Sequence, residues 1–326
     1  MIPRILLLGA SGQVGWELAR SLQPLGQLVA WTRVDADLSQ PDVLVARVMA
    51  LAPDVIVNAA AYTAVDRAES ERALAFAVNA AAPAALASTA RALGALFVHY
   101  STDYVFDGSG SLPRNEQAAC APLNVYGESK LAGEAGIAAA GGDWLVLRTS
   151  WVYAARGENF LTTMLRLGAS RSRLAVVADQ IGAPTSARLL ADSTAQILAR
   201  ALVARLARTE AGTAPGAPAE AGPGAEVRAD AGFRSEVLHV CAAGQTSRHG
   251  FAQAILAGWR ARHGSASLSV CQVDAIASHD HPGAARRPLN SRLDCTRLAS
   301  RYGLRLPDWR EGLVLSLAEA SRPEGS

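Results

Sequence analysis

The stretch Ile5-Leu6-Leu7-Leu8-Gly9-Ala10-Ser11-Gly12-Gln13-Val14-Gly15 indicates the fold most directly. Its apolar run predicts a short buried strand, and its glycines follow in a G-x-x-G-x-x-G spacing. Val14, Leu18 and Leu22 recur at helical intervals, which predicts an amphipathic helix directly after the glycines. Small residues in such a strand-to-helix turn let the backbone approach a pyrophosphate, whose charge the helix N-terminus favours. We expect a dinucleotide to lie on Gly9, Gly12, Gln13, Val14 and Gly15, the alternative being a plain glycine-rich turn.

Further strand-like runs alternate with helical segments over the first half of the chain. They are 28–33, 54–58, 96–100 and 144–148. This alternation predicts an α/β fold, a doubly wound parallel sheet of the Rossmann type, over residues 1–150. Residues 151–326 are expected to form mainly a smaller α/β substrate-binding part, with some segments returning to the sheet. Residues from about 208 to 235 are rich in Ala, Gly, Pro and Glu, which predicts a flexible surface insertion.

The end of the second predicted strand bears on the choice of cofactor. An acid at this place hydrogen-bonds the adenine ribose, whereas an arginine attracts a 2′-phosphate. Thr32 and Arg33 stand there, so we favour NADPH and leave NADH open. Asp37 and Leu38 are predicted to bracket the adenine, and a helix-capping role for Asp37 or Ser39 is the alternative.

Small residues also follow the third predicted strand. Ala59, Ala60 and Ala61 leave room for a ligand at the carboxyl end of that strand, where ligands bind in open α/β sheets. The next helix is predicted over 70–82 and ends near Pro83, and a further helix covers 84–93.

Tyr126 and Lys130 are the candidate proton-transfer pair, because a spacing of four residues puts both on one face of a helix. A nearby ammonium favours a phenolate, so Lys130 is expected to lower the pKa of Tyr126 towards a useful range. Lysine is nearly absent from the chain, which gives Lys130 added weight. Ser101 and Thr102 end the predicted strand 96–100 and could donate to a carbonyl oxygen, or simply cap the next turn. His99 is expected to be an ordinary core histidine.

Composition narrows the class of protein. The chain has 326 residues and a formal net charge of +2, with both signs spread along it, so no nucleic-acid partner is expected. Its apolar runs are too short to span a bilayer, and its four cysteines are scattered as in a reducing cytoplasm. The cluster at 279–281 lacks a third ligand, so no metal site is predicted there.

Four motifs together resemble one family. They are 12–18 (GQVGWEL), 60–66 (AAYTAVD), 101–108 (STDYVFDG) and 287–291 (RPLNS), in addition to the Tyr126–Lys130 pair. The chain resembles the extended short-chain dehydrogenase/reductase family over nearly its whole length. Within that family it resembles reductases of 4-keto-6-deoxy nucleotide sugars. The resemblance implies reduction of the 4-keto group of a dTDP-4-keto-6-deoxy-L-sugar by NADPH or NADH, giving dTDP-L-rhamnose for O-antigen (lipopolysaccharide) precursors.

The resemblance also implies roles for individual residues. Tyr126 would donate the proton, Lys130 would hold the nicotinamide ribose, and Thr102 would hydrogen-bond the reacting oxygen. Further contacts to the sugar or its diphosphate are implied for Asp103, Trp151, Arg287, Asn290 and Arg292, of which the two arginines are candidate diphosphate cations.

The resemblance further concerns assembly. Some relatives join a homodimer through Mg²⁺. Thr296 stands where such relatives carry an acid, so Mg²⁺ is doubtful although Glu17 is kept, and a homodimer stays possible. Two alternatives remain open. The protein could be an epimerase or dehydratase that retains NAD, or a non-catalytic NADP-binding regulatory subunit.

Overall fold

The computed structural model describes residues 2–210, 232–280 and 283–320. Its centre is a six-stranded sheet in the order β10-β5-β4-β3-β1-β2, and every pairing within it is parallel. The strands are β1 (Arg4–Leu8), β2 (Gln27–Trp31), β3 (Val55–Asn58), β4 (Leu96–Thr102), β5 (Asp143–Thr149) and β10 (Glu236–His239). The predicted α/β, doubly wound parallel sheet is therefore confirmed.

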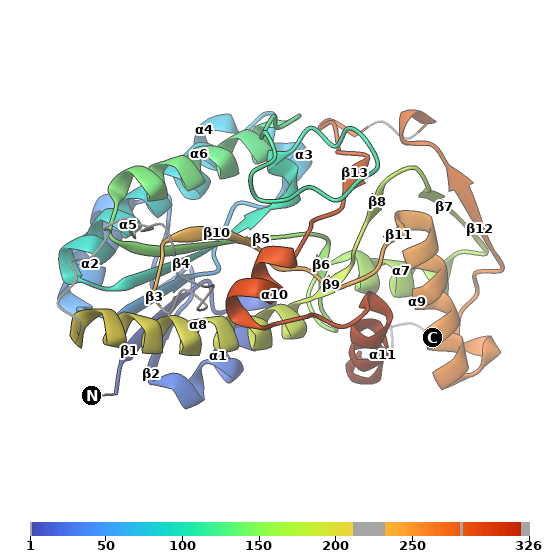
Figure 1. Ribbon diagram of the computed structural model, residues 1–326. Coiled ribbons are helices and arrows are strands. Elements are labelled where there is room, and N and C mark those ends of the chain that lie inside the picture. Colours follow the sequence, from blue (N-terminus) through green and yellow to red (C-terminus); the bar gives the residue numbers. More distant parts are fainter. Residues whose placement is uncertain (1, 211–231, 281–282, 321–326) are drawn as a thin grey trace, which may run out of the picture.

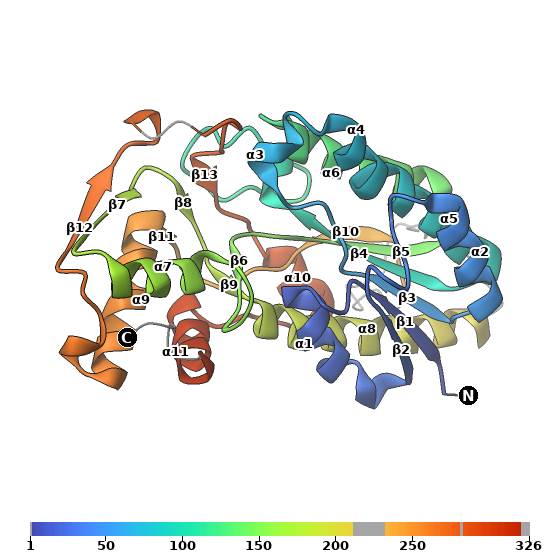
Figure 2. The same cartoon turned by 180° about the vertical axis from the view of Figure 1, so that it is seen from behind.

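Helices cover both faces of this sheet, as Figures 1 and 2 show from opposite sides. On one face lie α1 (Gln13–Ser21) and α8 (Ala187–Glu210), and on the other α2 (Pro41–Leu51), α5 (Ala82–Leu93) and α6 (Val125–Ala140). The alternation of strand side chains explains the two layers. Ile5 and Leu7 belong to the core cluster under α1 and α8, whereas Leu6 and Leu8 belong to the cluster under α2 and α5.

Later segments of the chain contribute to both halves of the molecule. The strand β10 extends the main sheet beside β5, and α10 (Thr296–Tyr302) packs beside β10. A second core holds α7 (Phe160–Ser170), α9 (Arg248–His263) and α11 (Trp309–Glu319). The short strands around it are β6 (Val152–Tyr153), β7 (Arg173–Val177), β8 (Ile181–Gly182), β9 (Thr185–Ser186), β11 (Thr246–Ser247), β12 (Gln272–Ile276) and β13 (Asn290–Ser291).

The helix after β3 differs from the prediction. It follows a short α3 (Val65–Ala68) and does not end near Pro83. Instead α4 (Arg72–Phe76) continues through a π-helical turn at Ala77–Ala81 into α5, with Pro83 in the first turn of α5. Proline is tolerated there because the π turn already breaks the ordinary hydrogen-bond ladder.

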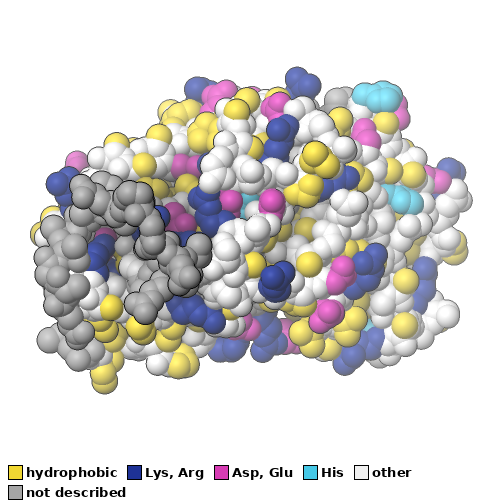
Figure 3. Space-filling view, viewed as in Figure 1, with side chains coloured by type: hydrophobic (Ala, Val, Ile, Leu, Met, Phe, Trp, Pro, Cys, Tyr) yellow, Lys and Arg dark blue, Asp and Glu magenta, His cyan; other side chains and the backbone are white. Residues whose placement is uncertain are grey.

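The stretch Arg72–Leu93 is also long and apolar enough, by length and composition alone, to cross a membrane. Core helices pass the same test, and here α5 packs against α6 and α2. On the face shown in Figure 3, basic and acidic side chains are interspersed. Most of the predicted insertion at 208–235 lies outside the described residues. The short strands β8 and β9 and the helix α10 were not predicted from the sequence.

Candidate active site

The glycine turn between β1 and α1 is shaped for close backbone approach. Gly9 has φ +78°, and a Cβ there would lie 2.7 Å from the Ala60 nitrogen. A Cβ on Gly15 would lie 2.0 Å from the Gly9 carbonyl oxygen. Only glycine fits at these two positions, so the first helical turn sits directly on the strand end. A dinucleotide pyrophosphate needs this kind of cradle, with free N–H groups at the start of α1.

The end of β2 carries the predicted adenosine contacts. Arg33 has a side chain that is 78% exposed, and its Nε lies 3.7 Å from Asp37 Oδ2. Asp37 Oδ1 accepts hydrogen bonds from the Ser39 nitrogen at 2.9 Å and hydroxyl at 2.8 Å. Neither residue caps α2, whose N-cap is Gln40, so the capping alternative is wrong. Leu38 is buried in the core.

The alanines after β3 lie beside the glycine turn, half-buried, and a buried asparagine holds the loop that follows them. Asn79, in the π turn, accepts from the Tyr62 nitrogen at 2.9 Å and donates to the Tyr62 carbonyl at 3.0 Å. Its amide also donates to the Ser129 hydroxyl of α6 at 3.0 Å. The π turn therefore places Asn79 where it joins this loop to the helix that carries Tyr126. Sequence reasoning gave Asn79 no role.

Tyr126 is positioned by the start of α6. Asn124 caps the helix, its Oδ1 accepting from the Gly127 nitrogen at 2.8 Å, and its Nδ2 donates to the Arg286 carbonyl at 2.7 Å. A Cβ on Gly127 would lie 2.3 Å from the Tyr104 carbonyl oxygen, so the helix start is packed against the turn after β4. This packing places the Tyr126 side chain beside that of Thr102.

The electrostatics of Tyr126 differ from the expectation. Burial raises the pKa of Tyr126, the Thr102 hydrogen bond partly opposes this rise, and Asp103 and Tyr104 add to it. The Lys130 amine is 2.6 Å from the Tyr100 carbonyl oxygen and 2.9 Å from His99 Nε2. The two side chains share a helix, but Lys130 does not contribute to the pKa of Tyr126 in this arrangement. The Lys130 amine therefore does not directly lower the pKa of Tyr126, because it points at His99 and Tyr100 of β4.

Thr102 and Asp103 lie at the carboxyl end of β4, both buried. Thr102 Oγ1 accepts from the Tyr104 nitrogen at 3.2 Å and donates to Asp103 Oδ1 at 3.2 Å. Thr102 therefore caps the next turn, as one of the two alternatives predicted, and its donation to a reacting carbonyl oxygen stays a prediction. Burial raises the pKa of the Asp103 carboxyl to about 6, and Ser291, Arg248 and Thr102 oppose the rise.

Trp151, which follows β5, has an unusual backbone, with φ +49°. A Cβ on Gly182 would lie 2.7 Å from the Trp151 indole ring, so Gly182 makes room for it. The Arg248 guanidinium lies over the indole at 3.8 Å from the ring centroid, and 5.4 Å from that of Phe160. Sequence reasoning missed Arg248, because nothing near it in the chain marks it.

Arg287 and Arg248 both lie beside the Tyr104 hydroxyl. Arg287 makes a bidentate ion pair with Asp66, with Nη2–Oδ2 at 2.5 Å and Nη1–Oδ1 at 3.2 Å. Among the ion pairs of the described residues, by contrast, none involves Arg248. The Tyr104 ring meets the Tyr126 ring edge to face at 5.5 Å, so this pair of arginines borders the proton-transfer residues.

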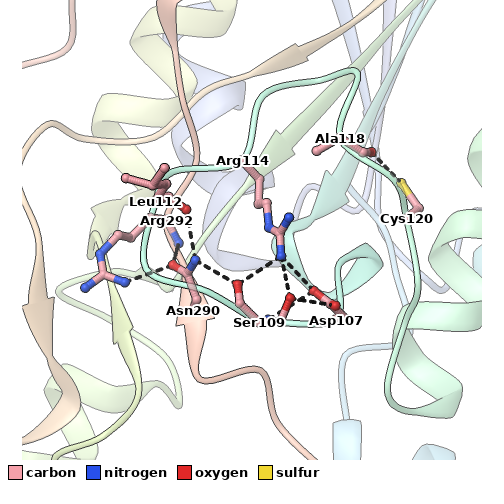
Figure 4. A network of polar contacts seen from close by, with 8 residues as sticks. All are labelled: Asp107, Ser109, Leu112, Arg114, Ala118, Cys120, Asn290 and Arg292. Carbon is pink, nitrogen blue, oxygen red and sulfur yellow. Dashed lines mark hydrogen bonds and ion pairs between the residues drawn. The ribbon is translucent and has the colours of Figure 1, made fainter.

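Asn290 and Arg292, two further residues predicted to contact the substrate, form hydrogen bonds within the protein (Figure 4). Asn290 Nδ2 donates to the carbonyls of Ser109 at 3.3 Å and Leu112 at 2.9 Å. Its Oδ1 accepts from the Arg292 nitrogen at 3.2 Å and Nη1 at 3.0 Å, and Arg292 also donates to Gln245. The amide of Asn290 is thus fully used in holding the 109–112 loop, and its substrate contact stays a prediction.

Arg292 lines a separate cavity of about 510 Å³ together with Cys241, Cys295 and Leu306. Neither Tyr126 nor Thr102 lines this cavity, so Arg292 is a poor candidate for a diphosphate cation of the site. No group of three His, Cys, Asp or Glu residues suited to a metal is found in the part of the chain that the structure describes. Thr296 hydrogen-bonds Asp294 at 2.6 Å, and Glu17 pairs with Arg20 at 3.6 Å.

A parallel sheet, a glycine turn under α1 and a threonine, tyrosine and lysine around one cleft define the class of protein. It is a dinucleotide-dependent oxidoreductase of the extended short-chain dehydrogenase/reductase type. The family model for the RmlD substrate binding domain matches residues 3–211 and 224–322. The dTDP-4-dehydrorhamnose reductase of Burkholderia thailandensis is 50% identical over 97% of this chain and 98% of its own.

Further similar proteins carry the same name. The dTDP-4-dehydrorhamnose reductase of Escherichia coli K12 is 43% identical, with 97% of each chain covered. A crystal structure of the Bacillus anthracis enzyme in complex with NADP superposes with a TM-score of 0.80 at 30% identity, covering 98% of this chain and 100% of that one. The chain belongs to the dTDP-4-dehydrorhamnose reductase family.

Proposed function

We propose that the protein reduces the 4-keto group of a dTDP-4-keto-6-deoxy-L-sugar with NADPH and forms dTDP-L-rhamnose. The observation that carries this proposal is the placement of Thr102 and Tyr126 beside each other at the carboxyl edge of the sheet, in a chain of this family. The match to a relative crystallised with NADP supports NADPH over NADH. Arg33, at the end of the second strand, has a side chain that is 78% exposed and so could meet a 2′-phosphate. Four free thiols fit the cytoplasm.

The residues of the glycine turn fit a dinucleotide, since a Cβ at Gly9 or Gly15 would collide with the backbone of Ala60 or Gly9 and prevent the tight turn on which a pyrophosphate would lie. Gly9 and Gly15 would hold the pyrophosphate, Arg33 and Asp37 would border the adenosine, and Lys130 would face the nicotinamide ribose. When bound, a reduced nicotinamide supplies a hydride for the sugar C4. The remaining chemistry belongs to side chains of this protein.

The proton is delivered at the C4 oxygen. As C4 gains the hydride, both electrons of its carbonyl π bond move to the oxygen, and the Tyr126 hydroxyl gives that oxygen its proton. Thr102 donates a second hydrogen bond to the same atom, so two aligned donors stabilise the charge as it develops. The resulting Tyr126 phenolate then regains a proton from solvent.

The substrate diphosphate is proposed to lie between Arg248 and Arg287. Arg287 is already neutralised by Asp66, whereas Arg248 rests on Trp151 without an acidic partner among the described ion pairs. A guanidinium is suited to a diphosphate because its planar fork donates two parallel hydrogen bonds. Trp151 and Asp103 would then border the sugar, between the diphosphate and Tyr126.

The test compares Tyr126→Phe with Tyr104→Phe in purified protein with NADPH and dTDP-4-keto-6-deoxy-L-lyxo-hexose. Loss of the Tyr126 hydroxyl should lower kcat by about 100- to 1,000-fold while NADPH binding persists. Tyr104→Phe changes an equally buried ring beside the arginines, and its effect should fall on KM. A Tyr126→Phe enzyme with unchanged turnover would remove this residue from the reaction. If the wild type forms no dTDP-L-rhamnose, the proposed reaction itself is wrong.

A further inference from the structure

A buried hydrogen-bonded row connects β3, β4 and α6 behind the proton-transfer residues. Asn58 Nδ2 lies 3.1 Å from His99 Nδ1, and His99 Nε2 lies 2.9 Å from Lys130 Nζ. All three side chains are at most 2% exposed. Asn58 and His99 are register partners in the sheet, so the row is fixed by the β3–β4 pairing as well as by side-chain packing.

The orientation of the Asn58 amide follows from its second contact. The Ala60 backbone nitrogen lies 3.1 Å from Asn58 Oδ1 and can only donate. The amide oxygen therefore faces Ala60, and the amide NH₂ faces His99 Nδ1. A neutral imidazole has one acceptor and one donor nitrogen, so Nδ1 accepts and the ring hydrogen is on Nε2.

This tautomer has a consequence for Lys130. The Nε2–H group points at Lys130 Nζ, and a 2.9 Å contact is a hydrogen bond only if Nζ has a lone pair. A free amine provides that lone pair and can still donate to the Tyr100 carbonyl at 2.6 Å. An ammonium would place two donors against each other in a buried site, which is unfavourable.

We propose that His99 is a positioning residue, with its tautomer fixed by Asn58, that disfavours the ammonium form of Lys130. The fraction of Lys130 that is a free amine has to bind one proton, taken from solvent water, before it can act as a cation beside the cofactor. Burial also lowers the pKa of Lys130, to about 8, which acts in the same direction.

The other charged groups near this amine do not change the assignment. Glu134, one turn further along α6, favours the ammonium form. It is, however, engaged in a buried ion pair with Arg148 of β5, at 2.9 and 2.5 Å. From β4, His99 and the Tyr100 carbonyl face the amine. Burial lowers the pKa of His99, and an ammonium at Lys130 would lower it further, so the ring is neutral in both protonation states of Lys130. On α6, Tyr126 adds no charge at neutral pH because its pKa is raised.

The chain offers a direct measurement, because Lys130 is its only lysine. Protein grown with ¹³C- and ¹⁵N-labelled lysine gives the signals of this residue alone, and the Cε shift reports protonation of the amine. Without added NADPH, the wild type should titrate at about pH 8 or below. An ordinary value near about 10.4 would overturn the proposal.

The tautomer is tested independently of any variant. Long-range ¹H–¹⁵N spectra of the wild type distinguish an Nε2–H from an Nδ1–H histidine, and contacts to the single lysine identify His99. An Nδ1–H ring would overturn the assignment. No substrate or turnover is needed, so these outcomes are separate from those that test the proposed reductase reaction, on which the role of Lys130 rests.

Asn58→Asp is the decisive substitution because it is isosteric. A carboxylate accepts from both Ala60 and His99 Nδ1, moves the ring hydrogen to Nδ1 and turns the Nε2 lone pair towards Lys130. The Lys130 titration should rise by at least one pH unit. Asn79→Asp is the control: this buried asparagine contacts Ser129 of the same helix but not His99, and its shift should be clearly smaller. Equal shifts in the two variants, or none in Asn58→Asp, would contradict the proposal.

Discussion

Arg248 offers the sharpest test of where the substrate diphosphate binds. Its guanidinium lies 3.8 Å from the Trp151 ring centroid, and no acidic side chain is paired with it among the described ion pairs. A charge-assisted hydrogen bond contributes about 1.5–3 kcal/mol, and each 1.4 kcal/mol is tenfold in affinity. Arg248→Met keeps a side chain on the indole but removes the charge, so KM for the nucleotide sugar should rise by about 10- to 150-fold.

Two further results follow from the same geometry. NADPH affinity should be unchanged in Arg248→Met, because the cofactor cradle lies at Gly9 and Gly15 on the main sheet. The melting temperature should change little, because Arg248 forms no ion pair among the described residues and the methionine side chain keeps an apolar contact with the indole.

The assay is steady-state kinetics at saturating NADPH, with NADPH binding and thermal unfolding measured on the same preparations. Arg310 provides a matched control, since its guanidinium also lies over a tryptophan, Trp309, at 4.6 Å, but its side chain is 66% exposed. Arg310→Met should leave KM within about twofold of the wild type. Unchanged KM in Arg248→Met, or an equal rise in Arg310→Met, would refute the placement of the diphosphate.

Three stability predictions follow. Burial raises the pKa of Asp103 to about 6, so the folded state favours the protonated carboxyl. The free energy of unfolding of the wild type should therefore decrease as the pH rises from about 4 to about 6. In urea unfolding, Asp103→Asn should be more stable than the wild type by about 3 kcal/mol at pH 7.5, and the two should be equally stable below pH 4. An equal difference in stability at both pH values would contradict the raised pKa of Asp103. Gly15→Ala places a Cβ 2.0 Å from a backbone oxygen, against 3.3 Å for Gly12→Ala, so it should cost about 1–3 kcal/mol and the latter clearly less. Glu134→Gln breaks an ion pair whose side chains are 5% and 7% exposed, and it should cost about 3–5 kcal/mol of stability. Glu128 lies on the same helix, but in its pair with Arg72 of α4 the side chains are 57% and 40% exposed, so Glu128→Gln should cost about 1 kcal/mol or less.

Local features of the sequence predicted local features of the structure. The strand, glycine turn and helix at 5–22 depend on residues next to one another in the chain, and so does the spacing of Tyr126 and Lys130. The Pro83 boundary failed because a proline was taken to end a helix, whereas a π turn before it already interrupts the hydrogen-bond ladder.

Long-range contacts could not be predicted in the same way. Arg248 reaches Trp151 only after α9 packs into the second core, and Asp66 meets Arg287 across 221 residues. The cysteines looked scattered, yet the sulfur atoms of Cys241 and Cys295 lie 3.6 Å apart. Each of these contacts is set by the tertiary fold, and no nearby residue pattern encodes it.

Tyr126 and Lys130 lie one turn apart on α6, and burial shifts the pKa of each in the direction that opposes catalysis. Burial makes the phenol a weaker acid and the amine a weaker base. The Lys130 amine is directed at His99 and the Tyr100 carbonyl, while the Tyr126 hydroxyl is directed at Thr102. A Tyr-Lys spacing alone therefore does not make an acid–base pair. A ribose bound above the glycine turn would provide polar atoms through which the two side chains could be joined by hydrogen bonds. The function of Tyr126 and Lys130 as an acid–base pair therefore depends on the glycine turn that would hold the dinucleotide as much as on the two side chains.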